Sequence, residues 1–82
     1  RTIRSQRYKY GFTVGMPEQL YDLQTDPNET QNLASSTHHR PVLLDLRGRL
    51  YRWMHRHQDH SLARNAMRQH WLREGWRVDD VD

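Results

Sequence analysis

Residues 7–23 read RYKYGFTVGMPEQLYDL and carry the clearest structural pattern in the chain. Aromatic and apolar side chains alternate with polar or small ones in the first half, the period of two that a half-buried strand requires. Gly15 and Pro17 interrupt the alternation, because glycine tolerates a positive φ and proline lacks the N–H that a strand ladder needs. The stretch therefore predicts two antiparallel strands, over about 7–14 and 19–23, joined by a hairpin turn.

A third strand is predicted upstream of this hairpin. Residues 1–5 contain Ile3 as an inward-facing side chain, and Ser5 and Gln6 favour a turn into the next strand. The first 23 residues are thus expected to form an antiparallel meander. A sheet this small has one apolar face that another element must cover.

A polar loop and a long helix are expected after the meander. Residues 24–36 begin with a run of turn-forming polar residues and are predicted to form the loop. Serine and threonine at 35–37 are candidate N-caps, and Pro41 fits a first helical turn but not a helix interior. We therefore predict a helix over about 38–58.

The predicted helix has one apolar stripe. Apolar side chains and one histidine recur at spacings of three and four, which places them on a single face. The stripe consists of Leu43, Leu46, Leu50, Trp53 and His57, flanked by Val42 and Met54. The other faces, expected to be wet, hold Asp45, Arg47, Arg49, Arg52 and Arg56.

Residues 59–82 have a weaker pattern and are predicted to form a helical or irregular tail. Leu62, Ala66, Met67 and either His70 or Trp71 make a short stripe that Gly75 would end. The predicted fold class is α+β: a small antiparallel meander of three to four strands packed on one long amphipathic helix, with a second, weaker helix or tail.

The predicted core is small for an independent domain of 82 residues. It comprises Ile3, Tyr8, Tyr10, Phe12, Leu20, Tyr21, Leu23, Leu33, Leu43, Leu46, Leu50 and Trp53. Four further large side chains have no place in it: Met16, Met67, Trp71 and Trp76. We therefore expect the chain to be stable only when it docks on a partner domain or associates with copies of itself.

Composition excludes several classes of protein. Only 34% of the residues are hydrophobic, and no apolar run is long enough for a membrane span or a signal peptide. There is no cysteine, and therefore no disulfide or thiolate metal site. The formal charge is uneven: residues 1–35 balance to zero, residues 36–77 carry nine arginines against three acids, and residues 78–82 contain three aspartates.

Possible catalytic and metal-binding residues do not form a recognised pattern. Only His57 and His60, among His55, His57, His60 and Asp59, have the spacing that places two ligands on one helical face. His38 and His39 fare no better. None of the serines lies in a nucleophile elbow, and there is no glycine-rich phosphate loop. We predict no catalytic, cofactor-binding or metal-ligating residue in this chain.

The stretch EQLYDLQTDPNETQNLA, residues 18–34, resembles the C-terminal subdomain of the sulfatase family, in which an E-L-Y-D-L strand precedes a D-P-x-E-x-x-N-L-A loop and a helix. RTIRSQRYKY at 1–10 is similar to the paired strands before it, and VLLDLRGRLYRWM at 42–54 to the helix after it. The resemblance covers residues 1 to about 54 and assigns 1–58 to such a subdomain, to which the parent protein would add a fourth strand.

The resemblance implies a function for a parent enzyme rather than for these residues. Sulfatases hydrolyse sulfate esters with a formylglycine made in a C/S-x-P-x-R motif and with a divalent cation, usually calcium. Ser5, Ser35, Ser36 and Ser61 all lack proline two positions on, so none fits that motif. The chain is expected to be the noncatalytic C-terminal portion of a sulfatase-like hydrolase, packing on the catalytic domain and helping to shape its substrate cleft.

The sequence leaves an alternative function and the cellular compartment open. The alternative function is an arginine-rich binding module for an anionic polymer, nucleic acid or sulfated glycan. Nucleic acid is the weaker choice because Trp53 lies on the apolar stripe, where a core role is favoured over base stacking. The compartment is unknown, since relatives of this kind are periplasmic, secreted or lysosomal as well as cytoplasmic.

Overall fold

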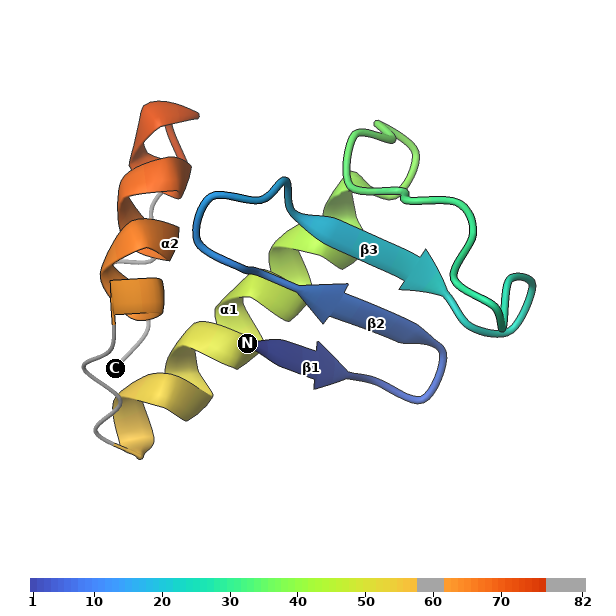
Figure 1. The fold of residues 1–82 in the computed structure, drawn as a ribbon, viewed down its shortest axis with the longest axis horizontal. Coiled ribbons are helices and arrows are strands. Elements are labelled where there is room, and N and C mark those ends of the chain that lie inside the picture. Colours follow the sequence, from blue (N-terminus) through green and yellow to red (C-terminus); the bar gives the residue numbers. More distant parts are fainter. Residues whose placement is uncertain (58–61, 77–82) are drawn as a thin grey trace.

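A three-stranded antiparallel sheet and two helices make up the fold (Figure 1). The computed structural model describes residues 1–57 and 62–76. The strands are β1 (Thr2–Arg4), β2 (Tyr8–Gly11) and β3 (Gln19–Asp22), in that order across the sheet. The helices are α1 (Arg40–Arg56) and α2 (Leu62–Arg73). The predicted α+β class is confirmed, whereas the boundary predicted between residues 58 and 59 lies outside the described residues.

The pleat of the sheet decides which strand residues enter the core. Tyr10 pairs with Ile3 on one side and Leu20 on the other, so the three side chains share the face that α1 covers. Tyr21 follows Leu20 directly and therefore points to the opposite face, opposite Lys9. The prediction that Tyr21 and Leu23 belong to the core is wrong. They lie one and three positions after Leu20, and odd spacings along an extended chain place side chains on opposite faces.

Helix α1 is rotated about its own axis relative to the orientation that its apolar stripe predicts. Leu43, Leu46 and Leu50 are buried as predicted, and Pro41 lies in the first turn. However, Trp53 is 45% exposed, so its predicted place in the core is wrong. Arg47, predicted to be wet, is fully buried. The buried side of α1 also includes Tyr51 and Met54, because α2 packs there.

Helix α2 completes the core. Met67 and Trp71 are fully buried, so the prediction that they lie outside the core is wrong. The Trp71 ring meets Tyr51 of α1 edge-on, with centroids 5.7 Å apart, and Trp76 folds back to meet Trp71 at 5.1 Å. Gly75, whose φ is +83°, allows this reversal after the helix ends. The predicted weak stripe therefore forms a genuine packing surface.

The two edges of the sheet differ. On β3, the Asn32 side chain accepts from the Leu20 N–H at 3.0 Å, and the Leu20 carbonyl accepts from the Leu33 N–H at 2.7 Å. On β1, the Ser5 N–H donates to Tyr8, and Thr2 alternates with residues that bond to β2. The backbone of Thr2 thus faces outward, and within the described residues no element pairs with that edge. The loop covers one edge and leaves the other open.

Candidate functional site

Glu18 stands at the centre of a buried polar cluster. It follows Pro17 at the end of the hairpin turn, and its side chain is only 7% exposed. One carboxylate oxygen accepts hydrogen bonds from the Tyr10 hydroxyl at 2.5 Å, from Arg47 Nε at 2.7 Å and from Trp71 Nε1 at 3.3 Å. The hairpin, α1 and α2 therefore meet on a single carboxylate.

Arg47 bridges two carboxylates from within α1. One of its terminal nitrogens donates to Glu18 and also to Glu74, the latter at 2.9 Å. Its guanidinium lies 5.6 Å from the ring centre of Trp71 and 5.4 Å from that of Trp76. The aromatic faces stabilise the cation where no water reaches it. Nη1 makes no hydrogen bond within the described residues.

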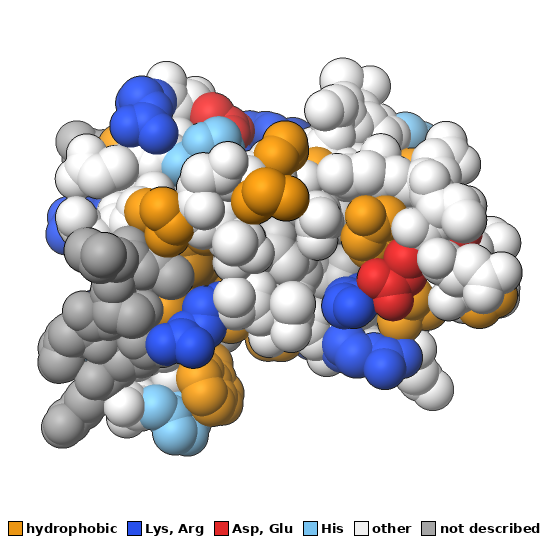
Figure 2. Space-filling model, in the orientation of Figure 1, with side chains coloured by type: hydrophobic (Ala, Val, Ile, Leu, Met, Phe, Trp, Pro, Cys, Tyr) orange, Lys and Arg blue, Asp and Glu red, His pale blue; other side chains and the backbone are white. Residues whose placement is uncertain are grey.

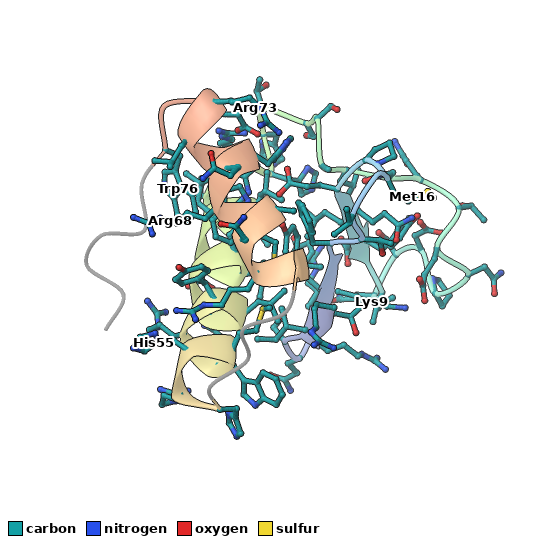
Figure 3. The ribbon with its side chains drawn as sticks, turned by 60° about the vertical axis from the view of Figure 1, so that its left-hand side comes forward. Lys9, Met16, His55, Arg68, Arg73 and Trp76 are labelled. Atoms are coloured by element: carbon teal, nitrogen blue, oxygen red, sulfur yellow. The ribbon has the colours of Figure 1, made fainter. Side chains whose placement is uncertain are left out.

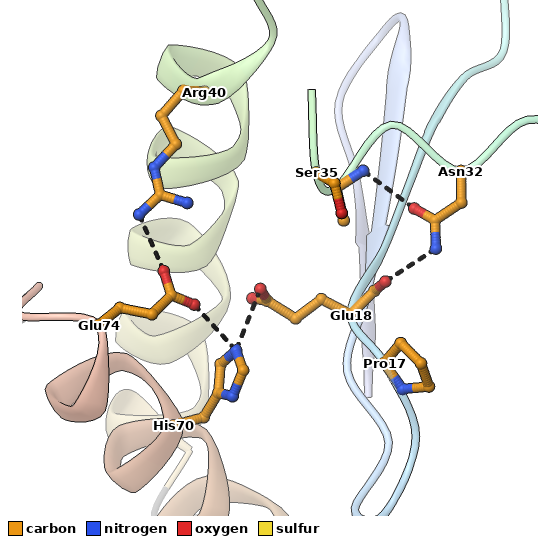
Figure 4. Close-up of a pocket in the computed structure, with 8 residues that line it drawn as sticks. Pro17, Glu18, Asn32, Ser35, Arg40, His70 and Glu74 are labelled. Carbon is orange, nitrogen blue, oxygen red and sulfur yellow. Dashed lines mark hydrogen bonds and ion pairs between the residues drawn. The ribbon is translucent and has the colours of Figure 1, made fainter. Parts of the chain in front are cut away.

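Glu74 and His70 form the outer half of the cluster. Glu74 accepts a hydrogen bond from Arg40 at 2.8 Å, and His70 Nε2 lies 3.0 Å from its other oxygen. The same nitrogen is 3.4 Å from Glu18. His70 and Glu74 are four residues apart, which places both side chains on one face at the end of α2. Figure 4 shows the row from Arg40 through Glu74 and His70 to Glu18.

The electrostatics keep this cluster charged. Burial alone would raise the pKa of Glu18, but the hydrogen bonds from Arg47 and Tyr10 outweigh it, and the pKa lies below its usual range. The pKa of Glu74 is lowered in the same way, with Arg40 and Arg47 outweighing burial. Burial and the neighbouring Glu18 carboxylate raise the pKa of the Tyr10 hydroxyl. The two carboxylates stay ionised and the phenol stays protonated at neutral pH.

A pocket of about 340 Å³ opens beside the cluster (Figure 4). It is lined by Pro17, Glu18, Asn32, Ala34, Ser35, Arg40, His70 and Glu74. One ligand atom each from Glu18, His70 and Glu74 lies within 4.8 Å of the others, which is close enough to share a cation. However, Arg47 already supplies the positive charge between the carboxylates, so a metal ion would have to displace it. The geometry favours a clamp between elements over a metal centre.

The histidines and serines weighed in the sequence do not join this cluster. His57 ends α1 exposed and stacked on Trp53, with ring centres 4.2 Å apart. His39 bonds to Ser36 at 2.9 Å in the turn before α1. Ser35 is the one that reaches the pocket wall. Three others, Asp59, His60 and Ser61, lie outside the described residues.

Sequence reasoning missed the residues that do meet. Glu18 stood in the quoted motif without a role, and Arg47 was assigned to the wet face. The signal for Arg47 was its spacing, four residues after Leu43 and three before Leu50, which places it beside the apolar stripe. His70 and Glu74 could have been paired by their helical spacing of four. Nothing in the sequence indicates that all four converge.

Comparison with known proteins finds a likeness to a sulfatase. Over 60 residues, 72% of this chain, the sequence is 37% identical to a Delta 4,5-hexuronate-2-O-sulfatase from Bacteroides thetaiotaomicron. The chain contains a sulfatase-related segment. That match covers 12% of the length of the sulfatase. No protein-family model and no solved structure matches the chain.

Proposed function

We propose that this chain is the noncatalytic C-terminal portion of a sulfatase-like hydrolase, which packs on the catalytic domain and helps to shape its substrate cleft. The observation that carries the proposal is the 37% identity to a sulfatase. The match covers only 12% of the length of that sulfatase. On this proposal, most of the enzyme, including any formylglycine and calcium site, lies outside these residues.

The polar cluster fits a structural role in such an enzyme. A hydrolytic centre needs an activated nucleophile and a group that stabilises developing charge, both within reach of substrate. Here Glu18 is saturated by Arg47, Tyr10 and Trp71, and the phenol of Tyr10 is buried with its proton retained. Among the described residues, the inner part of this cluster joins three elements through groups that are already hydrogen-bonded to one another.

The hairpin tip is the surface that we propose for docking on the catalytic domain. Val14 is 52% exposed and Met16 is 56% exposed, on a turn whose Gly15 has a φ of +82°. Figure 2 shows hydrophobic side chains exposed over this turn, and Figure 3 shows Met16 directed away from both helices. Apolar side chains held outward by a tight turn suit insertion against a partner surface.

The coding sequence upstream of Arg1 gives the first test. The proposal requires a C/S-x-P-x-R motif in the same reading frame, several hundred codons before Arg1. A frame that stops shortly upstream, with no such motif in a neighbouring gene, would contradict it.

Binding to the separately produced catalytic domain gives the second test. We expect co-elution with the 82-residue chain and weaker binding by Met16→Asp. Trp53→Asp is the matched control, because Trp53 is a comparably exposed apolar residue, 45% exposed, at the far end of α1. Equal binding by both variants would mean that the hairpin tip is not part of the interface.

The arginine-rich binding module has less support as the main function. Four arginines are already engaged with carboxylates, which reduces the cationic surface available to a polymer. These pairs are Arg7 with Asp22, Arg40 with Glu74, Arg47 with Glu18 and Glu74, and Arg49 with Asp45. Among the other arginines, Arg52 lies on α1 and Arg64 and Arg68 lie on α2.

A further inference from the structure

The outer sides of α1 and α2 form one basic face, made of Arg52, His55, Arg64 and Arg68. Arg64 of α2 crosses to α1: its guanidinium lies 5.2 Å from the ring centre of Tyr51, and one terminal nitrogen is 2.8 Å from His55 Nδ1. This contact places the two helical ridges side by side. Figure 3 shows His55 and Arg68 on the same side of the molecule.

The two ends of the face follow from helical spacing. Arg68 lies one turn beyond Arg64 on α2, and so continues the same ridge. Arg52 lies one turn beyond Gly48 on α1 and folds back over it, with a terminal nitrogen 3.5 Å from the position that a Cβ on Gly48 would occupy. His55 lies three residues after Arg52, so both lie on one side of α1, and the contact between Arg64 and His55 joins this side to the ridge of Arg64 and Arg68.

No acid of the described residues neutralises this face. Arg52 and Arg68 form no ion pair with any carboxylate of the described residues. The described acids are engaged elsewhere: Glu18 and Glu74 hold Arg47, Asp22 holds Arg7, Glu29 holds Lys9, Asp45 holds Arg49, and Asp26 binds backbone of its own loop. A polyanion is the occupant that such a surface complements.

We propose that this basic face binds a sulfated glycan chain. Guanidinium groups bind sulfate oxygens through paired N–H donors, and two ridges of them suit a linear polymer that presents anions along its length. The choice of glycan over nucleic acid rests on the proposed function. It also rests on Tyr51, which is only 8% exposed and lies beneath Arg64, so that it offers no platform for base stacking.

The experiment titrates the 82-residue chain with a heparin octasaccharide over a series of salt concentrations. The test variant is Arg52→Gln with Arg68→Gln. The control is Arg4→Gln with Arg73→Gln, which removes the same charge from β1 and from the far end of α2. Thermal melts verify that both variants fold like the parent chain.

We expect the test variant to bind about tenfold more weakly, with a salt slope lower by about 2, because two anion contacts and their released counterions are lost. The control should bind within about twofold of the parent chain. Equal losses in both variants would mean that net charge alone drives binding, and would overturn the proposal.

A single-stranded DNA of equal charge is the competing ligand. Tighter binding of DNA than of the octasaccharide would overturn the glycan assignment in favour of nucleic acid. These measurements use the isolated chain and do not depend on the upstream coding sequence, so the basic face and the proposed function can fail separately.

Discussion

Arg47 is the residue on which the contact between the hairpin and both helices depends. Its side chain is fully buried, and both of its counter-charges come from other elements. A buried guanidinium is tolerated only where hydrogen-bonded carboxylates replace the water that it has lost. Removing either side of this arrangement leaves an ion buried without compensation.

We expect Arg47→Met to lower the free energy of unfolding by about 3–5 kcal/mol, because Glu18 then stays buried without its cation. Arg49→Met is the matched control on the same helix. Arg49 is 53% exposed and, within the described residues, forms an ion pair with Asp45 one turn away, a contact worth at most about 0.5 kcal/mol. Urea denaturation of both variants measures the difference.

The double variant Arg47→Met with Glu18→Gln separates lost charge from lost packing. It should recover part of the loss, because the uncompensated carboxylate is gone. If Arg47→Met and Arg49→Met unfold at the same urea concentration, Arg47 does not hold the cluster together.

Aspartate substitutions at Leu46 and at Trp53 should affect stability very differently, because the first side chain is buried and the second is exposed. Leu46 is 1% exposed, so Leu46→Asp buries a carboxylate in the core and should unfold the chain. Trp53 is 45% exposed and stacks on His57, so Trp53→Asp should cost about 1 kcal/mol or less. Circular dichroism melts distinguish the two, and a similar collapse in both would restore Trp53 to the core.

Residue-scale prediction succeeded where burial followed local spacing and failed where it followed distant charge. Leu43, Leu46 and Leu50 are apolar at helical intervals, and all three are buried. Arg47 is buried because Glu18 and Glu74 reach it from 29 and 27 residues away along the chain. Helical periodicity contains no information about partners that far apart.

At the scale of elements, the sequence predicted the three described strands and α1 but overestimated their lengths, and it left α2 open as a helix or an irregular tail. The predicted strand over 7–14 is β2, Tyr8–Gly11, because pairing with β3 ends at Gly11 and Gln19. The predicted helix over 38–58 is α1, Arg40–Arg56. The alternation of apolar and polar side chains runs on to Val14, beyond the last residue of β2 that pairs with β3. The sequence pattern is therefore longer than the strand that it predicts.

The attachment of α2 should depend on pH. Glu18 and Glu74 have folded-state pKa values below those of an unfolded chain. Their contribution to stability is therefore present above the unfolded pKa of about 4.3 and is lost as the pH falls through the lower folded values. We expect the environment of Trp71, followed by its fluorescence, to change in acid below about pH 4.

Glu18→Gln is the variant that checks this dependence. It removes one of the two depressed carboxylates, so its stability should vary less with pH between about 5 and 2 than that of the parent chain. If the stability of Glu18→Gln falls with pH as steeply as that of the parent chain, the cluster around Glu18 does not govern acid unfolding. The remaining dependence comes from three other carboxylates with depressed pKa values: Glu74, Asp22, which is held by Arg7, and Asp26, which is held by backbone N–H groups of its own loop.

For the molecule as a whole, we expect no hydrolytic activity from the isolated chain. The described polar cluster has its carboxylates occupied by arginines, and no serine of the sequence lies in a C/S-x-P-x-R motif. Incubation of the purified 82-residue chain with an aryl sulfate and calcium should release no more phenol than buffer does. Turnover that follows the chain through further purification would contradict the noncatalytic assignment.

Of the four large side chains expected to need a partner surface, three find contacts within the chain. Met67 and Trp71 are buried in the core, and Trp76 packs against it. Met16 remains exposed, together with Val14 beside it. The need for a partner depends on how much of the apolar surface α2 covers. The weak apolar stripe of α2 did not indicate that it would cover so much.

The unequal edges of the sheet limit how copies of this chain can assemble. Asn32 and Leu33 occupy the backbone groups of Leu20 along β3, so among the described strands β1 provides the edge beside which a strand from another molecule can add. Two copies joined through their β1 edges would use both openings and leave none. Edge pairing thus ends at a closed pair, and the growth of a continuous cross-molecule sheet, the first step toward a fibril, is blocked by one asparagine side chain and the loop that carries it.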